Sequence, residues 1–438
     1  MTISTKPPSG TRDFLPDDIR RRQYVIGVIR GVYEKYGFEP LETPAFENIE
    51  TLLGKYGEEN AKLVFKILKR GEHEASGEAD LALRYDLTVP LSRVVAQYQN
   101  ELPKFFKRYQ IQPVWRADRP AKGRFREFFQ CDIDSIGSTS PIVEVEQLSA
   151  VSEVLTRLGF NDFVVRLNDR RLLTALLGSF SIDPAQHETA LVAIDKLDKI
   201  GPDGVKKELA ARGVNESAAA RMLTVFAEQS SNLDLAADML GAGFPALANF
   251  REILRLAEET AGRGRFRVDL SLARGLSYYT GAIMEVTVPD LAGSLGGGGR
   301  YDNLIGSFLG RDVPACGFSL GLERILVVMT ERSMFPEAVT RGAVDILVTI
   351  WNEASVERSL ALASELRRTG LRVETYPEAD KLGKQFKYAS SRHVPFIAVE
   401  GDDERASGEV SIKDLRSGDQ VKMPRAEAAT FITSRLNG

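Results

Sequence analysis

The sequence predicts an α+β protein, in which two strand-rich segments flank a helical insertion and a separate α/β domain follows at the C-terminal end. Three observations carry this prediction. Residues 105–134 show the period of two that is typical of paired antiparallel strands. Residues 170–255 are rich in Ala and Leu at helical spacing, and the chain beyond residue 340 alternates between strand and helix patterns.

The composition is that of a folded protein outside the membrane. The chain has 438 residues, of which 43% are hydrophobic and 27% are charged, which suits about two to four domains with real cores. A membrane-spanning helix needs about 18 or more apolar residues in a row, and the sequence has no such run. The N-terminal MTISTKPPSGTRDF lacks the apolar segment of a secretory signal.

Cysteine and histidine are scarce. Cys131 and Cys316 provide no disulfide framework, and three scattered histidines provide no zinc cluster. We therefore expect a cytoplasmic protein without a metal site or a permanent cofactor. The net charge of -4 means that any contact with nucleic acid must come from local basic patches.

A helix is predicted over residues 17–36. Asp17 and Asp18 follow Pro16 at its start, and Gly37 stands just past its end. Its apolar residues keep i, i+3, i+4, i+7 spacing on one face: Val25, Val28, Ile29, Val32 and Tyr36. This face fits a core helix or a helix at a dimer interface, and the pattern alone favours neither.

A long β-hairpin is predicted from RYQIQPVWR and RFREFFQCDID, with the turn-rich ADRPAKG between them. The period of two places Arg116, Arg126, Gln130 and Asp134 on polar faces, with the aromatic residues packed behind them. Residues 104–126 hold eight Lys or Arg against one acid. A solvated basic surface is the plain interpretation, but arginine forks also match phosphate oxygens of a nucleotide or an RNA backbone.

Two further segments indicate an anion site. SLGGGGRYD (294–302) carries four consecutive glycines after a strand, without the P-loop or GxGxxG fingerprint. Glycine within a strand indicates a bulge or the close approach of a ligand. GFSLGLERILVVM (317–329) predicts a helix with Arg324 in its first turn, where the helix N-terminus and the arginine could hold an anion jointly.

Two short segments complete a predicted polar pocket. LRYDLTVP (83–90) has a strand pattern that points Asp86 and Thr88 the same way, and RGLSYYTG (274–281) places Arg274 near two tyrosines. Each segment alone is more often structural than functional. Together with the arginine-rich hairpin and the glycine strand, they predict a pocket where carboxylates, arginines and aromatic rings converge.

These segments resemble the motifs of one enzyme class. RADRPAKGRFREFFQCDID resembles motif 2 of the class II aminoacyl-tRNA synthetases, GFSLGLERI resembles motif 3, and residues 17–44 with YGFEPLETP are similar to motif 1. RGLSYYTG and SLGGGGRYD resemble the two signature peptides of the histidyl-tRNA synthetase family, and LRYDLTVP matches its amino-acid loop. The resemblance extends over the whole chain.

The resemblance implies a fold and a domain plan. The family's fold is an antiparallel sheet flanked by helices, with a helical insertion and a C-terminal α/β anticodon-binding domain. The implied domains are a catalytic domain in two parts, residues 1–169 and 256–335, the insertion at 170–255, and the anticodon-binding domain at 340–438. It also implies a homodimer that pairs through residues 17–44.

The resemblance also implies the reaction. Histidine would attack the α-phosphate of ATP, which comes with Mg²⁺ as the substrate complex, and histidyl-adenylate would pass histidine to the 3′ end of tRNA(His). Arg116, Arg274 and Arg324 match the family's catalytic arginines. The implied histidine pocket comprises Asp86, Leu87, Thr88, Arg116, Gln130, Asp134, Arg274, Tyr278 and Tyr279. The implied ATP site comprises Arg116, Arg124, Phe128, Gly299 and Arg324.

One departure and two alternatives accompany this interpretation. Ser277 stands where the family commonly carries an acid, which puts the local hydrogen bonding in doubt. The main alternative is a non-catalytic, histidine-binding regulatory subunit of ATP phosphoribosyltransferase, although such relatives tend to lose the C-terminal domain and the ATP-gripping arginines. A general RNA-binding protein would explain the basic hairpin but neither the glycine strand nor the Arg324 helix.

Asp134 is the residue predicted to select histidine. Imidazole offers ring N–H donors at neutral pH, and a carboxylate is the strongest acceptor for them. The alternative is that Asp134 forms a structural ion pair with Arg126.

Overall fold

The computed structural model describes residues 3–56, 58–71, 76–229, 231–273 and 278–437. The chain divides into two compact units. The first comprises Met1–Leu15 and Arg22–Met334, and the second comprises Pro16–Arg21 and Phe335–Gly438. Among the helices formed by these described residues, none has the length and apolarity needed to cross a membrane.

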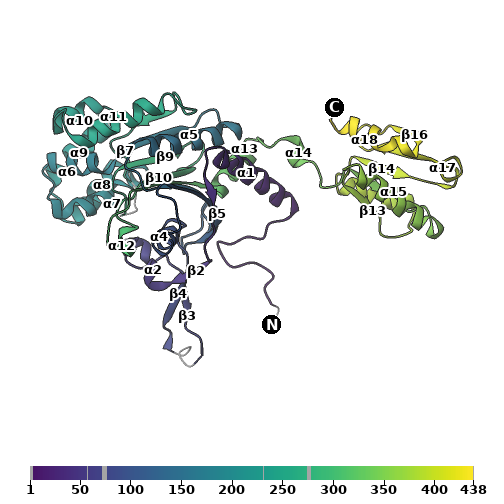
Figure 1. Ribbon diagram of the computed structural model, residues 1–438, viewed down its shortest axis with the longest axis horizontal. Helices are drawn as coiled ribbons and strands as arrows, with labels where there is room; N and C mark the ends of the chain where they lie inside the picture. The colour runs from purple at the N-terminus through teal and green to yellow at the C-terminus, as the bar shows by residue number, and fades with distance from the viewer. Residues whose placement is uncertain (1–2, 57, 72–75, 230, 274–277, 438) are drawn as a thin grey trace. The chain divides into compact units, whose positions relative to one another are not determined.

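The first unit is organised around a mixed, mainly antiparallel sheet, which has eight strands in the described residues (Figure 1). In spatial order they are β1 (Glu39–Pro40), β5 (Phe106–Trp115), β6 (Glu127–Ile136), β11 (Ala315–Gly321), β10 (Gly296–Arg300), β9 (Ala282–Thr287), β7 (Val164–Asp169) and β8 (Phe266–Val268). The two outermost pairs are parallel, and all the inner pairs are antiparallel. The predicted α+β class is therefore confirmed.

The predicted hairpin forms the β5–β6 pair. Trp115 pairs with Glu127 at the end next to the loop, and the backbone N–H of Arg116 donates to the carbonyl of Arg126, which extends the pairing by one step. The intervening residues 117–125 make the predicted loop.

Three helices cover one face of the sheet: α1 (Pro16–Lys35), α5 (Ile142–Arg157) and α13 (Leu322–Glu331). In the predicted apolar stripe of α1, Val25, Ile29 and Val32 are buried, whereas Val28 and Tyr36 are partly buried. The Tyr33 hydroxyl donates to the carbonyl of Cys131 on β6 at 3.0 Å. The buried Glu323 of α13 accepts from Nη1 of the buried Arg22 at 2.8 Å and from the Phe129 backbone N–H at 2.9 Å. These contacts fix the start of α13, and thus the base of Arg324, against α1 and β6.

The opposite face is covered by α4 (Thr88–Gln97) (Figure 1). On the same side, a small sheet joins β2 (Phe46–Asn48), β4 (Ala79–Leu83) and β3 (Lys66–Leu68), and its β3–β4 hairpin projects away from the large sheet. Short helices complete this region: α2 (Ile49–Leu52), α3 (Glu58–Ala61) and α12 (Gly306–Leu309).

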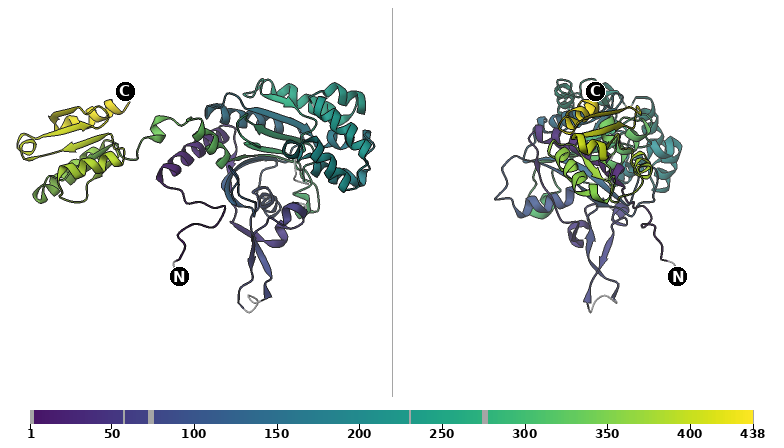
Figure 2. Two further views of the ribbon diagram at one scale, coloured as in Figure 1. Left: turned by 180° about the vertical axis from the view of Figure 1, so that it is seen from behind. Right: turned by 90° about the vertical axis from the view of Figure 1, so that its right-hand side faces the viewer.

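The helical segment predicted at 170–255 connects the parallel neighbours β7 and β8, a connection that requires a crossover. It comprises α6 (Arg170–Ser179), the 3₁₀ turn Pro184–Gln186, α7 (His187–Ile194), α8 (Leu197–Ala211), α9 (Glu216–Gln229), α10 (Leu233–Leu240) and α11 (Pro245–Ala257). Its own core includes Leu173, Leu177, Leu191, Leu209 and Met222. Figure 2 shows these teal helices gathered at one end of the large sheet.

The glycine run forms the central strand β10, and its neighbours are other strands. A Cβ at Gly296 or Gly298 would collide with the carbonyl oxygen of Ser319 or Gly317 on β11. A Cβ at Gly299 would lie 2.6 Å from the Ala282 carbonyl and 2.8 Å from the Tyr279 ring. The glycines therefore allow close packing against groups of the protein itself, and the predicted approach of a ligand stays a prediction.

The second unit contains its own sheet, in which the described strands follow the order β13 (Val373–Thr375), β12 (Ile346–Val348), β14 (Phe396–Val399), β15 (Glu409–Asp414) and β16 (Gln420–Pro424). The first three strands are parallel, as the predicted strand–helix alternation requires, and the last two add antiparallel pairs. The helices are α14 (Glu337–Thr340), α15 (Val356–Arg368), α16 (Leu382–Ser391), α17 (Asp402–Ser407) and α18 (Ala428–Asn437), with 3₁₀ turns at Glu353–Ser355 and Arg425–Glu427.

Candidate active site

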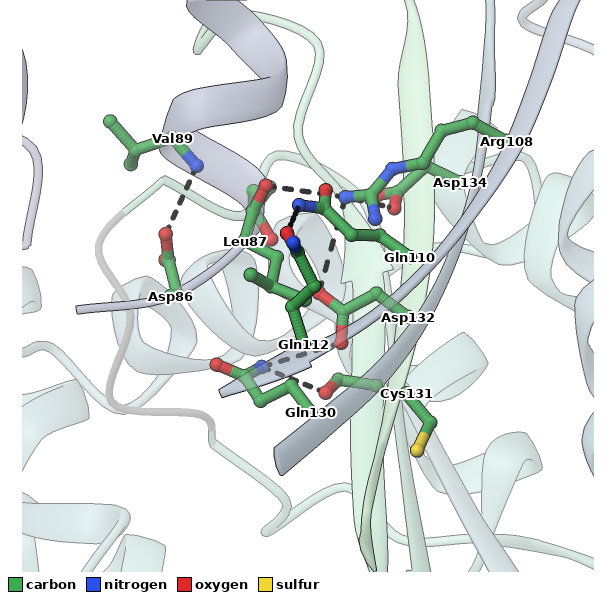
Figure 3. A network of polar contacts seen from close by, with 12 residues as sticks. Asp86, Leu87, Val89, Arg108, Gln110, Gln112, Gln130, Cys131, Asp132 and Asp134 are labelled. Carbon is green, nitrogen blue, oxygen red and sulfur yellow. Dashed lines mark hydrogen bonds and ion pairs between the residues drawn. The ribbon is translucent and has the colours of Figure 1, made fainter. Parts of the chain in front are cut away.

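Polar side chains occupy one face of the central strands in three cross-strand rows. Arg108, Asp134 and Gly317 make the first row, Gln110, Asp132 and Ser319 the second, and Gln112, Gln130 and Gly321 the third. Side chains two residues apart on a strand share a face, so each of the three strands contributes one residue to every row. We call the seven polar side chains of these rows the polar stripe: Arg108, Gln110, Gln112, Gln130, Asp132, Asp134 and Ser319. Figure 3 labels all of them except Ser319.

Asp134 lies at the buried end of the polar stripe. Nη2 of Arg108 lies 2.8 Å from Oδ2 of Asp134, and the Tyr301 hydroxyl donates to Oδ1. Asp134 is 2% exposed and Arg108 is 0% exposed. The ion pair that we considered for Asp134 therefore exists, but the partner is Arg108. The proposed partner Arg126 is wrong, because its Nε donates to the Asp118 carbonyl at 3.1 Å and its side chain packs on Gly10.

The Arg108–Asp134 pair leaves buried polar atoms with bonding capacity. Within the described residues, Nε and Nη1 of Arg108, Oε1 of Gln110 and Oδ2 of Asp134 have no hydrogen-bond partner, since the Arg108 contact with Oδ2 is an ion pair without hydrogen-bond geometry. Buried polar atoms are nearly always hydrogen-bonded. The polar stripe is therefore suited to a polar ligand.

Three carboxylates lie within electrostatic reach of one another at the polar stripe. Burial raises the pKa of Asp132 to about 7, the nearby Arg108 opposes that rise, and the charge of Asp134 adds to it. Burial also raises the pKa values of Asp134 and Asp86, against the opposing effects of Arg108 on Asp134 and of Arg116 on Asp86. When Asp132 and Asp134 are both ionised, the stripe holds more negative charge than the buried Arg108 alone can balance.

Replacing Asp132 with asparagine is expected to stabilise the protein above neutral pH. The folded protein binds the Asp132 proton more tightly than the unfolded chain, in which an aspartate has a pKa of about 3.9. The contribution of Asp132 to the free energy of unfolding of the wild type should therefore fall as the pH rises from about 4 to about 7, by up to ~1.4 kcal/mol per pH unit. Urea unfolding at about pH 5 and pH 8 measures this: the advantage of D132N should grow with pH, and a pH-independent difference would contradict it.

Arg116 stands directly after β5 and reaches the third row. Its Nε donates to the Tyr85 carbonyl at 3.0 Å, and its Nη2 donates to Oε1 of Gln130 at 3.4 Å. The guanidinium carbon lies 4.3 Å from the centroid of the Tyr85 ring and 5.1 Å from that of Phe128. The predicted convergence of Arg116, Gln130 and Phe128 is therefore present.

The segment LRYDLTVP is not a strand throughout. Strand β4 ends at Leu83 and helix α4 begins at Thr88, so the prediction that Asp86 and Thr88 share a strand face is wrong. Asp86 instead accepts from the Val89 backbone N–H at 3.0 Å, which satisfies a free donor of the first helical turn. The carbonyl of the buried Leu87 accepts from Nη2 of Arg108 at 3.3 Å (Figure 3).

Two tyrosines join Asp86 to the rest of the pocket. The Tyr56 hydroxyl donates to Oδ1 of Asp86 at 3.1 Å, and the Tyr278 hydroxyl lies 3.4 Å from Oδ2. The centroid of the buried Tyr279 ring lies 5.1 Å from that of the Tyr278 ring, and the Gly299 backbone lies beside the Tyr279 ring. Arg274 and Ser277, predicted as a catalytic arginine and as a departure from the family pattern, lie outside the described residues.

Of the predicted ATP residues, Arg124 lies in the hairpin loop, Arg324 at the start of α13, and Gly299 in β10. Strand β11 ends at Gly321, opposite Gln130, and Arg324 follows in the first turn of α13. Nη1 of Arg324 donates to the Ser294 carbonyl, and its side chain lies beside Gly123 of the hairpin loop. Arg124 is half exposed and binds Asp118 at 2.7 Å.

Several residues of this network were not predicted from the sequence to belong to the site: Tyr56, Arg108, Asp132, Tyr301 and Ser319. Two of them could have been found from the period of two, which places Arg108 on the polar side of its strand and Asp132 two residues from Gln130, on the same face. Within the described residues, no group of three or more His, Cys, Asp or Glu side chains is arranged to hold a metal ion.

Comparisons with known proteins agree over nearly the whole chain. A family model described as Histidyl-tRNA synthetase matches residues 10–325, and one described as Anticodon binding domain matches residues 344–435. The Histidine--tRNA ligase of Gloeobacter violaceus is 42% identical over 459 residues, and that of Porphyromonas gingivalis is 43% identical over 451 residues. Each alignment covers 98% of this chain and 98% of the relative.

Solved structures give the same match. The histidyl-tRNA synthetase of Nostoc sp. PCC 7120 superposes with a TM-score of 0.83 at 32% identity, covering 99% of this chain and 100% of that one. A Bacillus halodurans protein described as an ATP phosphoribosyltransferase regulatory subunit/histidyl-tRNA synthetase superposes with a TM-score of 0.70 at 20% identity, covering 88% of this chain and 97% of that one. The second likeness concerns the fold alone.

Proposed function

The chain belongs to the histidyl-tRNA synthetase family, and from this premise we propose how its residues charge tRNA with histidine. The activity is that of a histidine–tRNA ligase: ATP activates histidine to histidyl-adenylate, and histidine then passes to tRNA. The regulatory-subunit alternative has less support, because the ligase relatives and the anticodon-domain match span the chain.

One contact carries the assignment of roles. Gln130 belongs to the polar stripe, and its Oε1 accepts from Arg116, which the family resemblance aligns with an ATP-gripping arginine. We therefore assign Gln130 and Asp134 of the polar stripe, together with Asp86, Leu87, Thr88, Arg116, Tyr278 and Tyr279, to histidine. Arg116, Arg124, Phe128, Gly299 and Arg324 are assigned to ATP.

In the first step, the histidine carboxylate attacks the α-phosphorus of ATP and pyrophosphate leaves. Negative charge spreads over the phosphoryl oxygens, and a fixed cation at Arg116 stabilises it. The Tyr85 carbonyl and two aromatic rings hold that guanidinium, so it needs little reorganisation during the reaction. Arg274 is assigned to the same phosphate and to the histidine carboxylate on the family pattern.

Asp134 is proposed to accept from the imidazole ring. Its Oδ2 forms an ion pair with Arg108 but accepts no hydrogen bond from the described residues. This oxygen therefore keeps the capacity to accept a hydrogen bond from a ring N–H. Such a site rejects amino acids that lack the N–H, because the buried carboxylate would stay unpaired.

We propose that magnesium enters the site bound to the ATP phosphates. The described residues offer no set of three carboxylate, His or Cys ligands that could hold the ion, so no protein-derived magnesium site is assigned. The cytoplasm is the proposed compartment, since Cys131 and Cys316 are both free and buried.

The direct test of function is histidylation of tRNA. Purified protein, labelled histidine and ATP should charge tRNA(His) and no other tRNA. Binding of histidine without charging would favour the regulatory alternative.

A homodimer that pairs through residues 17–44 is also proposed. The apolar stripe of α1 already packs on the sheet of its own chain, with Val25, Ile29 and Val32 at 0% exposure, so the pairing must use other surfaces of this segment. The proposal therefore depends on the family pattern. Light scattering at micromolar protein should give twice the chain mass of 48.4 kDa, and a monomeric mass would overturn it.

The second unit is proposed to read the anticodon stem of the tRNA. It has its own core, which includes Ile346, Leu362, Phe396, Val410 and Ile432. Around α16, the side chains of Lys381, Lys384 and Lys387 are exposed, which suits contact with phosphates.

Removing residues 340–438 is expected to impair tRNA charging more than amino-acid activation, because activation uses only the first unit. The measurements are histidine-dependent ATP–pyrophosphate exchange and histidylation on the same preparation. Equal loss of both activities would contradict the assignment.

A further inference from the structure

We propose that Asp132 is a positioning residue, which orients the Gln130 side-chain amide so that its oxygen faces Arg116. The inference rests on the proposed role of Arg116 in holding ATP. Asp132 itself need touch neither substrate: it would act through Gln130.

The nitrogen and the oxygen of the Gln130 side-chain amide have different partners. Nε2 donates to Ser319 Oγ at 2.8 Å and to Asp132 Oδ1 at 3.4 Å, while Oε1 accepts from Arg116 Nη2 at 3.4 Å. Asp132 and Ser319 are neighbours in the second row of the polar stripe. Both acceptors of the amide nitrogen therefore lie on one side of Gln130, and the arginine lies on the other.

Of the two acceptors, only Asp132 decides the orientation. The two ends of a carboxamide have nearly the same shape, so the hydrogen-bond partners determine which end points where. A serine hydroxyl by itself donates or accepts, and therefore tolerates either end of the amide. Ser319 favours the N–H end because its own proton is donated to Asp132. An ionised carboxylate only accepts, so Asp132 requires the N–H end.

The orientation matters because Arg116 is a cation. With the amide reversed, Nε2 of Gln130 would point its N–H groups at the guanidinium, and Arg116 would lose one of its polar contacts. Its remaining polar contact among those described is the Tyr85 carbonyl, alongside the Tyr85 and Phe128 rings. Small displacements of a positioning cation lower turnover strongly, by about 10²-fold for 1 Å.

The ionisation of Asp132 offers an independent readout. A protonated Asp132 could donate to the amide oxygen and so accept the reversed amide. The charged and titratable groups around it are Arg108 on β5, Asp134 on β6, Asp86 before α4 and, across the sheet, Tyr33 of α1; β11 contributes the Ser319 hydroxyl. Because burial holds the pKa of Asp132 near 7, turnover at saturating substrates should rise with pH across neutrality.

The test compares D132N with S319A in the full-length protein by ATP–pyrophosphate exchange. An asparagine at position 132 can donate to the amide oxygen, so D132N should lower kcat about tenfold or more and raise the KM for ATP. Its melting temperature should be no lower than that of the wild type, and its kcat should lose the rise with pH. S319A, which removes the neutral acceptor, should stay within about threefold of the wild type.

A double-mutant cycle separates orientation from packing. With Gln130 replaced by methionine, the D132N change should have no further effect on kcat, because no amide remains to be oriented. Exchange in D132N within twofold of the wild type, an equal loss in S319A, or additive effects in the cycle would overturn the proposal. Should D132N fail to fold, a wild-type kcat that is flat between about pH 6 and 8 would overturn it.

R116A distinguishes failure of this inference from failure of the proposed function. If R116A abolishes exchange while D132N does not impair it, Arg116 acts on ATP without help from Asp132. If R116A leaves exchange intact, the assignment of Arg116 itself is wrong.

Discussion

Replacing Arg116 with alanine is expected to lower histidine-dependent ATP–pyrophosphate exchange by about 10³-fold. Arg116 supplies a fixed positive charge beside the third row of the polar stripe, with its Nε held by the Tyr85 carbonyl at 3.0 Å. Alanine removes this charge from the place where negative charge develops on the phosphoryl oxygens. The loss should therefore appear mainly in kcat.

The matched control is Arg119→Ala. Arg119 lies exposed in the same hairpin loop, so its removal changes the charge of the loop by the same amount without emptying the pocket. Exchange in this variant should remain within about threefold of the wild type, as for an ordinary surface substitution. A similar loss in both variants would mean that only the overall positive charge of the loop matters.

Replacing Asp134 is expected to affect both stability and histidine binding. Asp134→Ala leaves the 0% exposed Arg108 without its closest charged partner, which should lower the free energy of unfolding by about 3–5 kcal/mol. Urea unfolding measures this loss. Tyr301→Phe is the control, because it removes the hydroxyl that donates to Asp134 but leaves the ion pair, and it should cost less, about 1.5–3 kcal/mol, as for a hydrogen bond to a charged group.

The binding part of this prediction is tested with Asp134→Asn, which keeps the shape of the side chain. The KM for histidine should rise about 10²-fold or more, because the strongest acceptor for imidazole is lost, while the KM for ATP stays nearly unchanged. If the KM values for histidine and ATP rise together, or if only the stability falls, then Asp134 pairs with Arg108 and does not bind the imidazole.

The sequence predicted the hairpin and its polar face, but not which residues meet across strands. The period of two places Arg108, Gln130 and Asp134 on polar faces, yet only the register pairs Arg108 with Asp134. Register depends on the turn and on contacts between distant strands, which a single strand pattern does not contain. For this reason Arg126, which is nearer in sequence, was considered as the partner of Asp134.

The segment around Asp86 shows a different kind of error. Alternation over a few residues predicted a strand, but Pro90 lies in the first turn of α4, where its missing N–H breaks no intrahelical hydrogen bond, and Asp86 accepts from the Val89 N–H. An aspartate followed closely by such a proline is a helix-start signal that outweighs a short alternation.

Two other outcomes have simple physical causes. The four glycines were expected to mark a bulge or the close approach of a ligand, whereas Gly296 and Gly298 allow the backbone of β11 to pack closely. A sequence motif does not show which strands become neighbours.

The strands β15 and β16 were not predicted, although Val410 and Ile412 alternate with polar residues before the turn-forming Ser417 and Gly418.

The most direct test of the central claim is ATP–pyrophosphate exchange measured separately with each of the common amino acids. The claim is that the polar stripe and Arg116 together form a site that activates histidine. It predicts exchange with histidine alone, and no exchange with the other amino acids above background. Exchange with a different amino acid, or histidine binding without any exchange, would contradict it.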